Sequence, residues 1–206
     1  MNQWLSVFCL SLLSFTSLSF ANPLDEWEER SFKGNTVYQH LQKDGRNAIY
    51  GRAEGEASIL YREKSINLSK TPILSWEWKV SSTFGGEIDE LSEDGDDFPA
   101  RFYVVVKTGL FPWQTRAINY VWSSNQVVGN DWANPFTDKA RMVAVDSGDQ
   151  HLNQWRSHRR NIAEDFKRYF DLDADKIDGY AVMVDGDNSG GTAEAWFANI
   201  TFTSAR

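Results

Sequence analysis

The segment from Asp185 to Gly191 has the residue types of a site that binds a cation or a polar ligand. It reads Asp-Gly-Asp-Asn-Ser-Gly-Gly, with two carboxylates, an amide and a hydroxyl within five residues. Oxygen atoms of this kind are the ligands that Ca²⁺ prefers, and the glycines allow a turn tight enough to aim several at one point. We therefore assign Asp185, Asp187, Asn188 and Glu194 as candidate metal ligands, with calcium as the candidate cofactor.

The same segment is also consistent with an ordinary turn. Asp185, Asp187, Ser189 and Gly190 match the first half of an EF-hand loop, but the twelfth loop position, where a bidentate Glu is required, is Trp196. Asp, Asn, Ser and Gly are also the residues that turns use for left-handed conformations and local hydrogen bonds. The sequence leaves both interpretations open.

A second acidic segment precedes a predicted buried strand. Residues 85–97 contain seven acids, most of which are typical of a solvated loop. Asp96 and Asp97 differ because they stand directly before the Val-rich strand predicted over residues 98–106, which carries Arg101. Acids at the entry to a central strand, with an arginine nearby, can form an ion pair or a ligand clamp, or supply the same cation as the 185–191 segment.

Two predicted strands must position the 185–191 segment. Residues 180–184 are apolar on both faces, so this strand should lie centrally in a sheet. The strand that follows alternates, which predicts that one face carries Trp196, Ala198, Ile200 and Phe202. Further strands are predicted over residues 37–42, 47–54, 57–63, 74–80, 117–123 and 141–145, with turns at glycines.

Several other segments complete the expected fold. In the strand over residues 74–80, Trp76 and Trp78 share the apolar face and are predicted to be core residues. Residues 22–36 have little periodicity, with Trp27 and Phe32 as candidate anchors, and residues 127–137 read as a loop. Many short strands with one helix predict an all-β jelly-roll sandwich of the galactose-binding-like type.

One helix is predicted near residues 155–170, because its apolar residues recur at helical spacing. Ser157 is a candidate N-cap, and Asn153 would also serve. On this helix Asp165 would form an intrahelical ion pair with Arg168 or Arg159.

Composition and the N-terminal segment indicate an exported protein. Residues 1–21 read as a signal peptide with cleavage after Ala21, which predicts a periplasmic or secreted single domain over residues 22–206. Cys9, the only cysteine, would leave with it. The formal net charge of −8 argues against nucleic acid as a partner. No later stretch is apolar enough for membrane insertion, and we expect a monomer.

The order of several motifs resembles the bacterial exported family called domain of unknown function 3047. The resemblance extends over roughly Phe32 to the C-terminus and rests on Gly95-Asp96-Asp97 with Arg101, Tyr120-Val-Trp122, Trp155 with Arg160-Asn161 and Asp165, and Asp185-x-Asp187-Asn188. It implies a bacterial exported protein with carbohydrate-binding-like jelly-roll strands, and it implies no particular activity.

These motifs supply a set of candidate ligand-binding residues. The set comprises Asp96, Asp97, Arg101, Asn119, Trp122, Arg160, Asn161 and Asp165. Our hypothesis is that its polar members join Asp185 and Asp187 in one constellation at the sheet ends, with the helix closing over it.

Three functions fit these observations. Polar clamps and abundant aromatic residues favour a non-catalytic protein that binds a glycan or another polar envelope component, with a structural calcium ion. A polysaccharide hydrolase would pair Asp96 or Asp97 with Asp185, Asp187 or Glu194, and a lyase would place a base near Arg101 or Arg160. A structural envelope module would use the polar set as a buried network.

Overall fold

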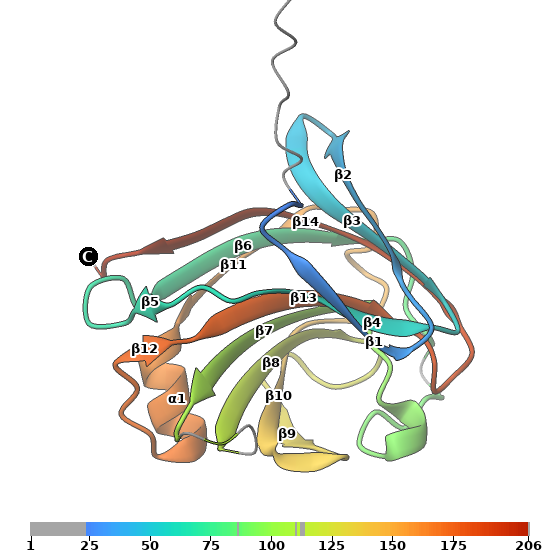
Figure 1. Ribbon diagram of the computed structural model, residues 1–206. Helices are drawn as coiled ribbons and strands as arrows, with labels where there is room; N and C mark the ends of the chain where they lie inside the picture. The colour runs from blue at the N-terminus through green and yellow to red at the C-terminus, as the bar shows by residue number, and fades with distance from the viewer. Residues whose placement is uncertain (1–23, 86, 110, 112–113, 206) are drawn as a thin grey trace, which may run out of the picture.

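The computed structural model describes residues 24–85, 87–109, 111 and 114–205. A five-stranded and a seven-stranded sheet lie face to face, one above the other in Figure 1. The all-β sandwich with one short helix is therefore confirmed. The signal peptide expected over residues 1–21 lies outside the described residues.

The seven-stranded sheet has the order β1-β4-β13-β7-β8-β10-β9. Its strands are β1 (Glu28–Lys33), β4 (Ala57–Arg62), β13 (Gly179–Asp185), β7 (Ala100–Lys107), β8 (Thr115–Ser123), β10 (Thr137–Ser147) and β9 (Asp131–Asn134). The five-stranded sheet, in the order β11-β6-β14-β3-β2, consists of β11 (Arg156–Asn161), β6 (Ile73–Val80), β14 (Thr192–Thr203), β3 (Arg46–Glu54) and β2 (Val37–Lys43). The remaining elements are β5 (Ile66–Asn67), β12 (Lys176–Ile177), the 3₁₀ turn η1 (Glu93–Gly95) and the helix α1 (Ile162–Phe170).

Aromatic side chains from both sheets fill the main core. Trp76 and Trp78 on β6 are buried, as predicted. The Trp76 ring lies 5.2 Å from the Phe102 ring and 5.4 Å from the Tyr120 ring, measured between centroids. These large side chains contribute much of the apolar area that holds the two sheets together.

The strand that leads to the 185–191 segment is central, as its two apolar faces predicted. β13 pairs with β4 on one side and with β7 on the other, both antiparallel. Val184 belongs to the main core, so its neighbour Asp185 faces the outer side of the sheet. In the same way, Phe102 and Tyr120 point into the core and place their neighbours Arg101 and Asn119 on the outer side.

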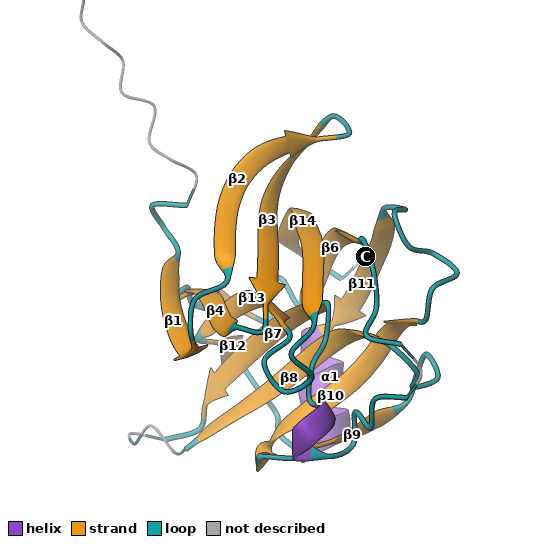
Figure 2. Ribbon diagram, turned by 90° about the vertical axis from the view of Figure 1, so that its right-hand side faces the viewer, coloured by secondary structure: helices purple, strands orange, loops and turns teal. Residues whose placement is uncertain are grey.

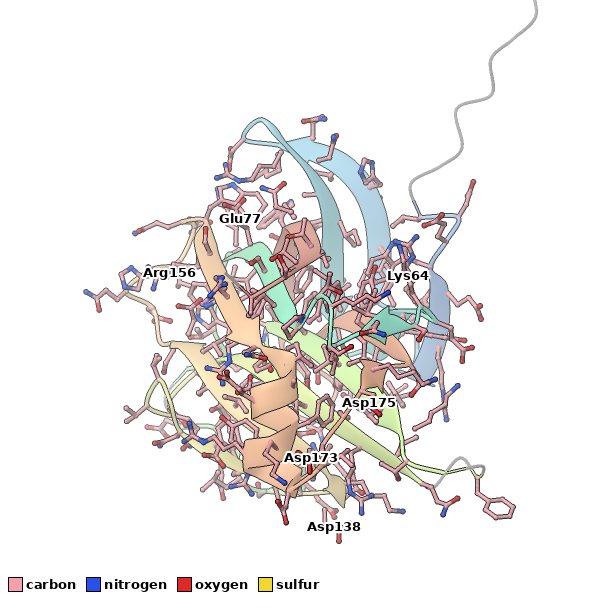
Figure 3. The ribbon with its side chains drawn as sticks, turned by 90° about the vertical axis from the view of Figure 1, so that its left-hand side faces the viewer. Lys64, Glu77, Asp138, Arg156, Asp173 and Asp175 are labelled. Carbon is pink, nitrogen blue, oxygen red and sulfur yellow. The ribbon has the colours of Figure 1, made fainter. Side chains whose placement is uncertain are left out.

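The predicted helix is shorter than expected, because residues 156–161 form strand β11. This strand pairs with β6 from Arg156 to Asn161. Asn161, not Ser157, caps the helix, and its side chain accepts a hydrogen bond from the Glu164 amide at 3.4 Å. Figure 3 shows α1 at the near side of the molecule, with Arg156 on the adjoining strand above it. Arg156, His158 and Arg160 alternate with the residues between them, which is the period of a strand. The helical spacing of the apolar residues over 155–170 concealed this alternation.

A β-bulge in β14 overturns the expected single face of that strand. Asn199 adopts a left-handed φ of 53°, and the pairing with β6 shifts in register between Ala198 and Thr201. Trp196 and Ala198 therefore pack in a small outer cluster, whereas Ile200 and Phe202 pack against the main core.

Like β11, the strands β1, β5, β9 and β12 lie in segments that the sequence did not predict to be strands. β1 and β9 form the two edges of the seven-stranded sheet, which Figure 2 shows from the side. β9 lies within residues 127–137, which were predicted to be a loop. Phe32 on β1 is 59% exposed, so it is not the anchor that was expected. In the described part of the chain, no helix has the length and apolar character needed to cross a membrane.

Candidate functional site

A buried arginine organises the outer face of the seven-stranded sheet. Arg101 on β7 is 3% exposed, and its Nε donates to Asp185 Oδ1 at 2.9 Å while its Nη2 donates to Asp185 Oδ2. The guanidinium also donates through Nη1 to Asp96 Oδ2 at 3.3 Å. Its carbon lies 4.6 Å from the centroid of the Phe98 ring. A planar, permanently charged fork suits this bidentate contact.

Asp97 holds the 185–191 segment in place. Its carboxylate accepts hydrogen bonds from the backbone amides of Asn188, at 3.2 Å, and Ser189. The side chain of Asn188 donates in turn to the Glu93 carbonyl of η1 at 2.5 Å. The segment is thus a turn that is hydrogen-bonded to the chain preceding β7.

Three carboxylates meet at this turn. Oxygen atoms of Asp97, Asp185 and Asp187 lie within 4.8 Å of one another. Burial raises the pKa of Asp185 to about 7, against the lowering effect of Arg101, and the nearby charges of Asp97 and Asp96 raise it further. Burial and the charge of Asp97 also raise the pKa of Asp187. The donor set fits a hard cation such as Ca²⁺, which takes carboxylate oxygens.

The metal ligands predicted from the sequence are only partly brought together. Asp185 and Asp187 meet, and Asp97, which was assigned to ligand binding, joins them. Glu194 has other partners, because its carboxylate accepts from Tyr50 Oη at 2.7 Å and lies 3.4 Å from Arg52 Nε. Glu194 lies on β14, beyond the turn, and its side chain is directed to Tyr50 and Arg52. Its short distance in sequence from Asp187 therefore does not make it a member of the carboxylate cluster.

A cavity of about 560 Å³ opens beside this cluster on the outer face of the sheet. It is lined by residues of β1, β4, β7, β8, β13, the β9–β10 hairpin, the chain before β7 and the 185–191 turn. They include Phe32, Asp96, Arg101, Tyr103, Asn119, Asn134, Phe136, Met183, Asp185, Asp187 and Asn188. Phe32 and Phe136 are 59% and 57% exposed. Volume, apolar walls and a few polar groups are those of a small-molecule site.

Two acceptors in this lining have no hydrogen-bond partner within the described ranges. They are Asp96 Oδ1 and Asn119 Oδ1, both buried. Asp96 uses its other oxygen to accept from Asn134 Nδ2 at 3.0 Å, and Asn119 donates to Met142 Sδ at 3.3 Å. An unpaired buried acceptor costs about 1–3 kcal/mol, so a donor from a ligand would stabilise both.

The single constellation expected from the sequence is instead divided between two places. Asp165 accepts from Arg160 Nε at 2.8 Å and from Tyr120 Oη at 2.5 Å. Tyr120 belongs to the main core, so this cluster lies at the inner face of the sheet, whereas Asn119 and Arg101 belong to the outer face. The predicted pairing of Asp165 with Arg168 or Arg159 is therefore wrong.

Two further candidate ligand residues have structural roles. Trp122 is fully buried, and its Nε1 donates to the Gly148 carbonyl at 3.1 Å. Asn161 caps α1 and donates to Glu164 Oε1 at 2.7 Å. Neither lines the outer cavity.

Sequence reasoning missed several residues of the cavity. Phe136 and Asn134 come from the hairpin that was read as a loop, and Phe32 comes from a segment without periodicity. Exposed phenylalanines beside polar turn residues were the available signal, but exposure could not be read from the sequence.

Comparison with solved structures finds several distant similarities. The xyloglucanase domain of NopAA, a type three effector from Sinorhizobium fredii in complex with cellobiose, has 13% identity and a TM-score of 0.43, covering 88% of this chain and 95% of that one. A CBM4 structure has 11% identity and a TM-score of 0.35, covering 90% of each chain. Endoglucanase 3 of family GH12 from Trichoderma harzianum has 6% identity and a TM-score of 0.36, covering 88% and 98%. With TM-scores below 0.5, these similarities carry no argument about ligand or activity.

The comparison with curated proteins finds no match. The family model described as protein of unknown function (DUF3047) matches residues 25–201. This range includes both acidic motifs, Arg101 and the final strand. The chain therefore belongs to the DUF3047 family, as the order of its motifs predicted.

Proposed function

We propose that this protein binds a saccharide, without transforming it, in the cavity between Phe32 and Phe136. The observation that carries the proposal is the pair of buried, unpartnered acceptors, Asp96 Oδ1 and Asn119 Oδ1, in the cavity lining. Sugar hydroxyls are donors that satisfy such acceptors. The two exposed phenylalanine rings supply apolar surface for the faces of pyranose rings.

The charge of the cavity narrows the ligand class. The described lining contains three carboxylates, those of Asp96, Asp185 and Asp187, and one cationic side chain, Arg101. Negative charge is therefore in excess. This charge favours neutral or amino sugars and disfavours uronic acids, because like charges in a poorly solvated site repel. Binding of this kind suits an exported bacterial protein, and we propose a periplasmic or secreted location.

A calcium ion is part of the proposal as a structural brace. Asp97, Asp185 and Asp187 would hold it through carboxylate lone pairs that their hydrogen bonds leave free, and its charge would offset their mutual repulsion. The ion would stiffen the 185–191 turn, which forms one wall of the cavity through Asp187 and Asn188.

The occupied carboxylates favour binding over catalysis. Asp185 is engaged by Arg101, and Asp97 is engaged by two backbone amides. A general acid or base must exchange a proton with the substrate within hydrogen-bond reach, and both of these groups are held by other donors. The exposed rings of Phe32 and Phe136 and the unpaired acceptors of Asp96 and Asn119 also favour a binding site over a purely structural network.

Calorimetric titration with neutral, amino and uronic sugars tests the proposal. We expect Asn119→Leu to weaken binding of the best sugar by about tenfold, equivalent to 1.4 kcal/mol for one lost hydrogen bond. Met142→Leu is the matched control, because it alters packing on the same face and keeps the Asn119 acceptor. Equal affinity in wild type and Asn119→Leu would refute the proposal, and so would the absence of binding by any sugar. Release of a cleaved product would favour the hydrolase or lyase instead.

A further inference from the structure

A second hollow lies on the same outer face, next to the cavity of about 560 Å³, which we call the acidic cavity because Asp96, Asp185 and Asp187 line it. Its volume is about 310 Å³. It is lined mainly by side chains of β1, β4, β7 and β13, among them Arg30, Phe32, Ile59, Tyr61, Val105 and Ala181. Of the residues lining the acidic cavity, Phe32 also lines this second hollow.

The strand registers place the two hollows end to end. Along β7 the acidic cavity takes Arg101 and Tyr103, and the second hollow takes Val105 and Lys107. Alternate residues of a strand share one face, so these four side chains form one continuous row. From Arg101 to Lys107 the row extends roughly 20 Å, at about 3.3 Å per residue.

The neighbouring strands repeat this arrangement. Met183 of β13 belongs to the acidic cavity and pairs with Ile59 of β4, which belongs to the second hollow. Two residues further along, Ala181 pairs with Tyr61, and both line the second hollow. The two hollows are therefore halves of one groove that follows the strands, with Phe32 where they meet.

The two halves of the groove differ in chemistry. The acidic half offers buried acceptors, including Asn119 Oδ1. The second half offers the half-buried apolar side chains Ile59, Tyr61 and Val105 on a face that is turned away from the core. A half-buried apolar row outside the core is typical of a binding surface. Such a row suits the face of a sugar ring, whereas the acceptors suit hydroxyl groups.

We propose that the groove binds a linear oligosaccharide, not a single sugar. One unit occupies the acidic cavity, the next stacks on Phe32, and the chain continues over Ile59, Tyr61 and Val105. This inference rests on the proposed function and adds to it the polymeric nature of the ligand. A chain of this kind contacts both halves, so each added unit increases the buried apolar area and the affinity until the groove is full.

Titration of residues 22–206, the chain expected after cleavage, with a length series of neutral oligosaccharides from one to six units tests the inference. In the wild type we expect affinity to rise by at least about tenfold from one unit to four and then to level off. Phe32 lines both hollows, so Phe32→Ala should weaken binding of a single unit and also remove most of that rise, which makes the loss of affinity larger for four units than for one. Phe32 is 59% exposed, so its truncation leaves the core intact.

Two further variants separate the halves of the groove. Phe136 lines the acidic cavity and is absent from the lining of the second hollow, so Phe136→Ala should weaken all chain lengths by the same factor. Tyr61 lines the second hollow and not the acidic cavity, so Tyr61→Ala should weaken only the longer chains. Both variants are compared with the wild type after thermal unfolding confirms that they are folded.

The outcomes distinguish this inference from the proposed function. Binding that does not depend on chain length in the wild type overturns the extended groove and leaves the acidic cavity as a site for one sugar. A uniform loss of affinity in Phe32→Ala, equal for one unit and for six, also overturns it. The absence of binding at every length overturns the proposed function itself.

Discussion

The side chain of Arg101 on β7 donates hydrogen bonds to both carboxylate oxygens of Asp185, the last residue of β13. The Nε to Oδ1 distance is 2.9 Å, and both residues are almost completely buried. The pair joins two central strands at the end of the sheet where the 185–191 turn begins. It therefore sets the position of the turn as well as the floor of the acidic cavity.

Removal of this arginine should strongly destabilise the fold. Arg101→Met leaves Asp185 buried without its cation, and we expect the free energy of unfolding to fall by about 3–5 kcal/mol. Urea denaturation at pH 8 is the suitable measurement. Burial raises the pKa of Asp185 to about 7, so its carboxylate is ionised at that pH. Arg52→Met is the control, since Arg52 forms partly exposed ion pairs and should cost less than about 1 kcal/mol. A loss of that small size in Arg101→Met would contradict the prediction.

Asp146 should make stability depend on pH. Burial opposes ionisation of its carboxylate, but hydrogen bonds from His158, Trp78 and Arg156 and the charge of His158 outweigh it and lower the pKa of Asp146. A lowered pKa in the folded state stabilises the fold above the unfolded-state pKa of about 4, and this stabilisation is lost as the pH falls through the folded-state value.

The Asp146→Asn variant isolates this effect. At pH 6 we expect it to be about 1–3 kcal/mol less stable than the wild type, because it lacks charge-assisted hydrogen bonds. Urea denaturation at pH 6, 4 and 3 should show this gap shrinking as the pH falls. A gap that stays constant over this range would mean that the carboxylate charge contributes nothing.

Calcium should raise the midpoint of thermal unfolding. A ligand at 100 times its dissociation constant adds about 2.7 kcal/mol, which corresponds to several degrees for a chain of this length. After treatment with EDTA, added Ca²⁺ should shift the wild type but not Asp187→Asn. Asp138→Asn removes the same charge from an exposed position and should keep the shift. If Ca²⁺ does not shift the unfolding midpoint of the wild type, Asp97, Asp185 and Asp187 do not form a calcium site.

The N-cap of α1 offers a test of the corrected helix boundary. Asn161→Ala removes the side chain that accepts from the Glu164 amide, and we expect a loss of about 1 kcal/mol. Asn161→Ser keeps a side-chain oxygen that can accept from this amide and should lose less stability than Asn161→Ala. If Ser157→Ala cost more than Asn161→Ala in the same chemical denaturation, the helix would begin earlier than the structure indicates.

Local pattern was sufficient where one period dominated. The two apolar faces of residues 180–184 identified β13 as a central strand, and the strict alternation around Trp76 and Trp78 identified two core residues. The two acidic motifs beside buried strands left a cation shared by Asp97 and the 185–191 segment as one of several alternatives, and the structure brings Asp97 to this turn. For the two strands, burial of one face leaves few alternative arrangements.

The rest depended on register and tertiary contacts. Arg160 and Asn119 were placed in one site, but adjacent residues of β8 face opposite sides, and Tyr120 draws the Arg160–Asp165 pair to the inner side. The bulge at Asn199 could not be seen in an apparently regular alternation. β11 was read as helix because helical spacing and strand alternation overlapped in one segment.

Strand β1 stands at a free edge of the seven-stranded sheet, and all six of its residues are exposed. Its Glu28, Glu29, Arg30 and Lys33 give this edge a dense mixture of charges. A second chain that added a strand here would have to strip water from these groups, which opposes edge-to-edge aggregation. The same strand carries Phe32, which lines both halves of the groove. Charges that keep a second chain away from this edge therefore also keep the groove open to its ligand at high protein concentration.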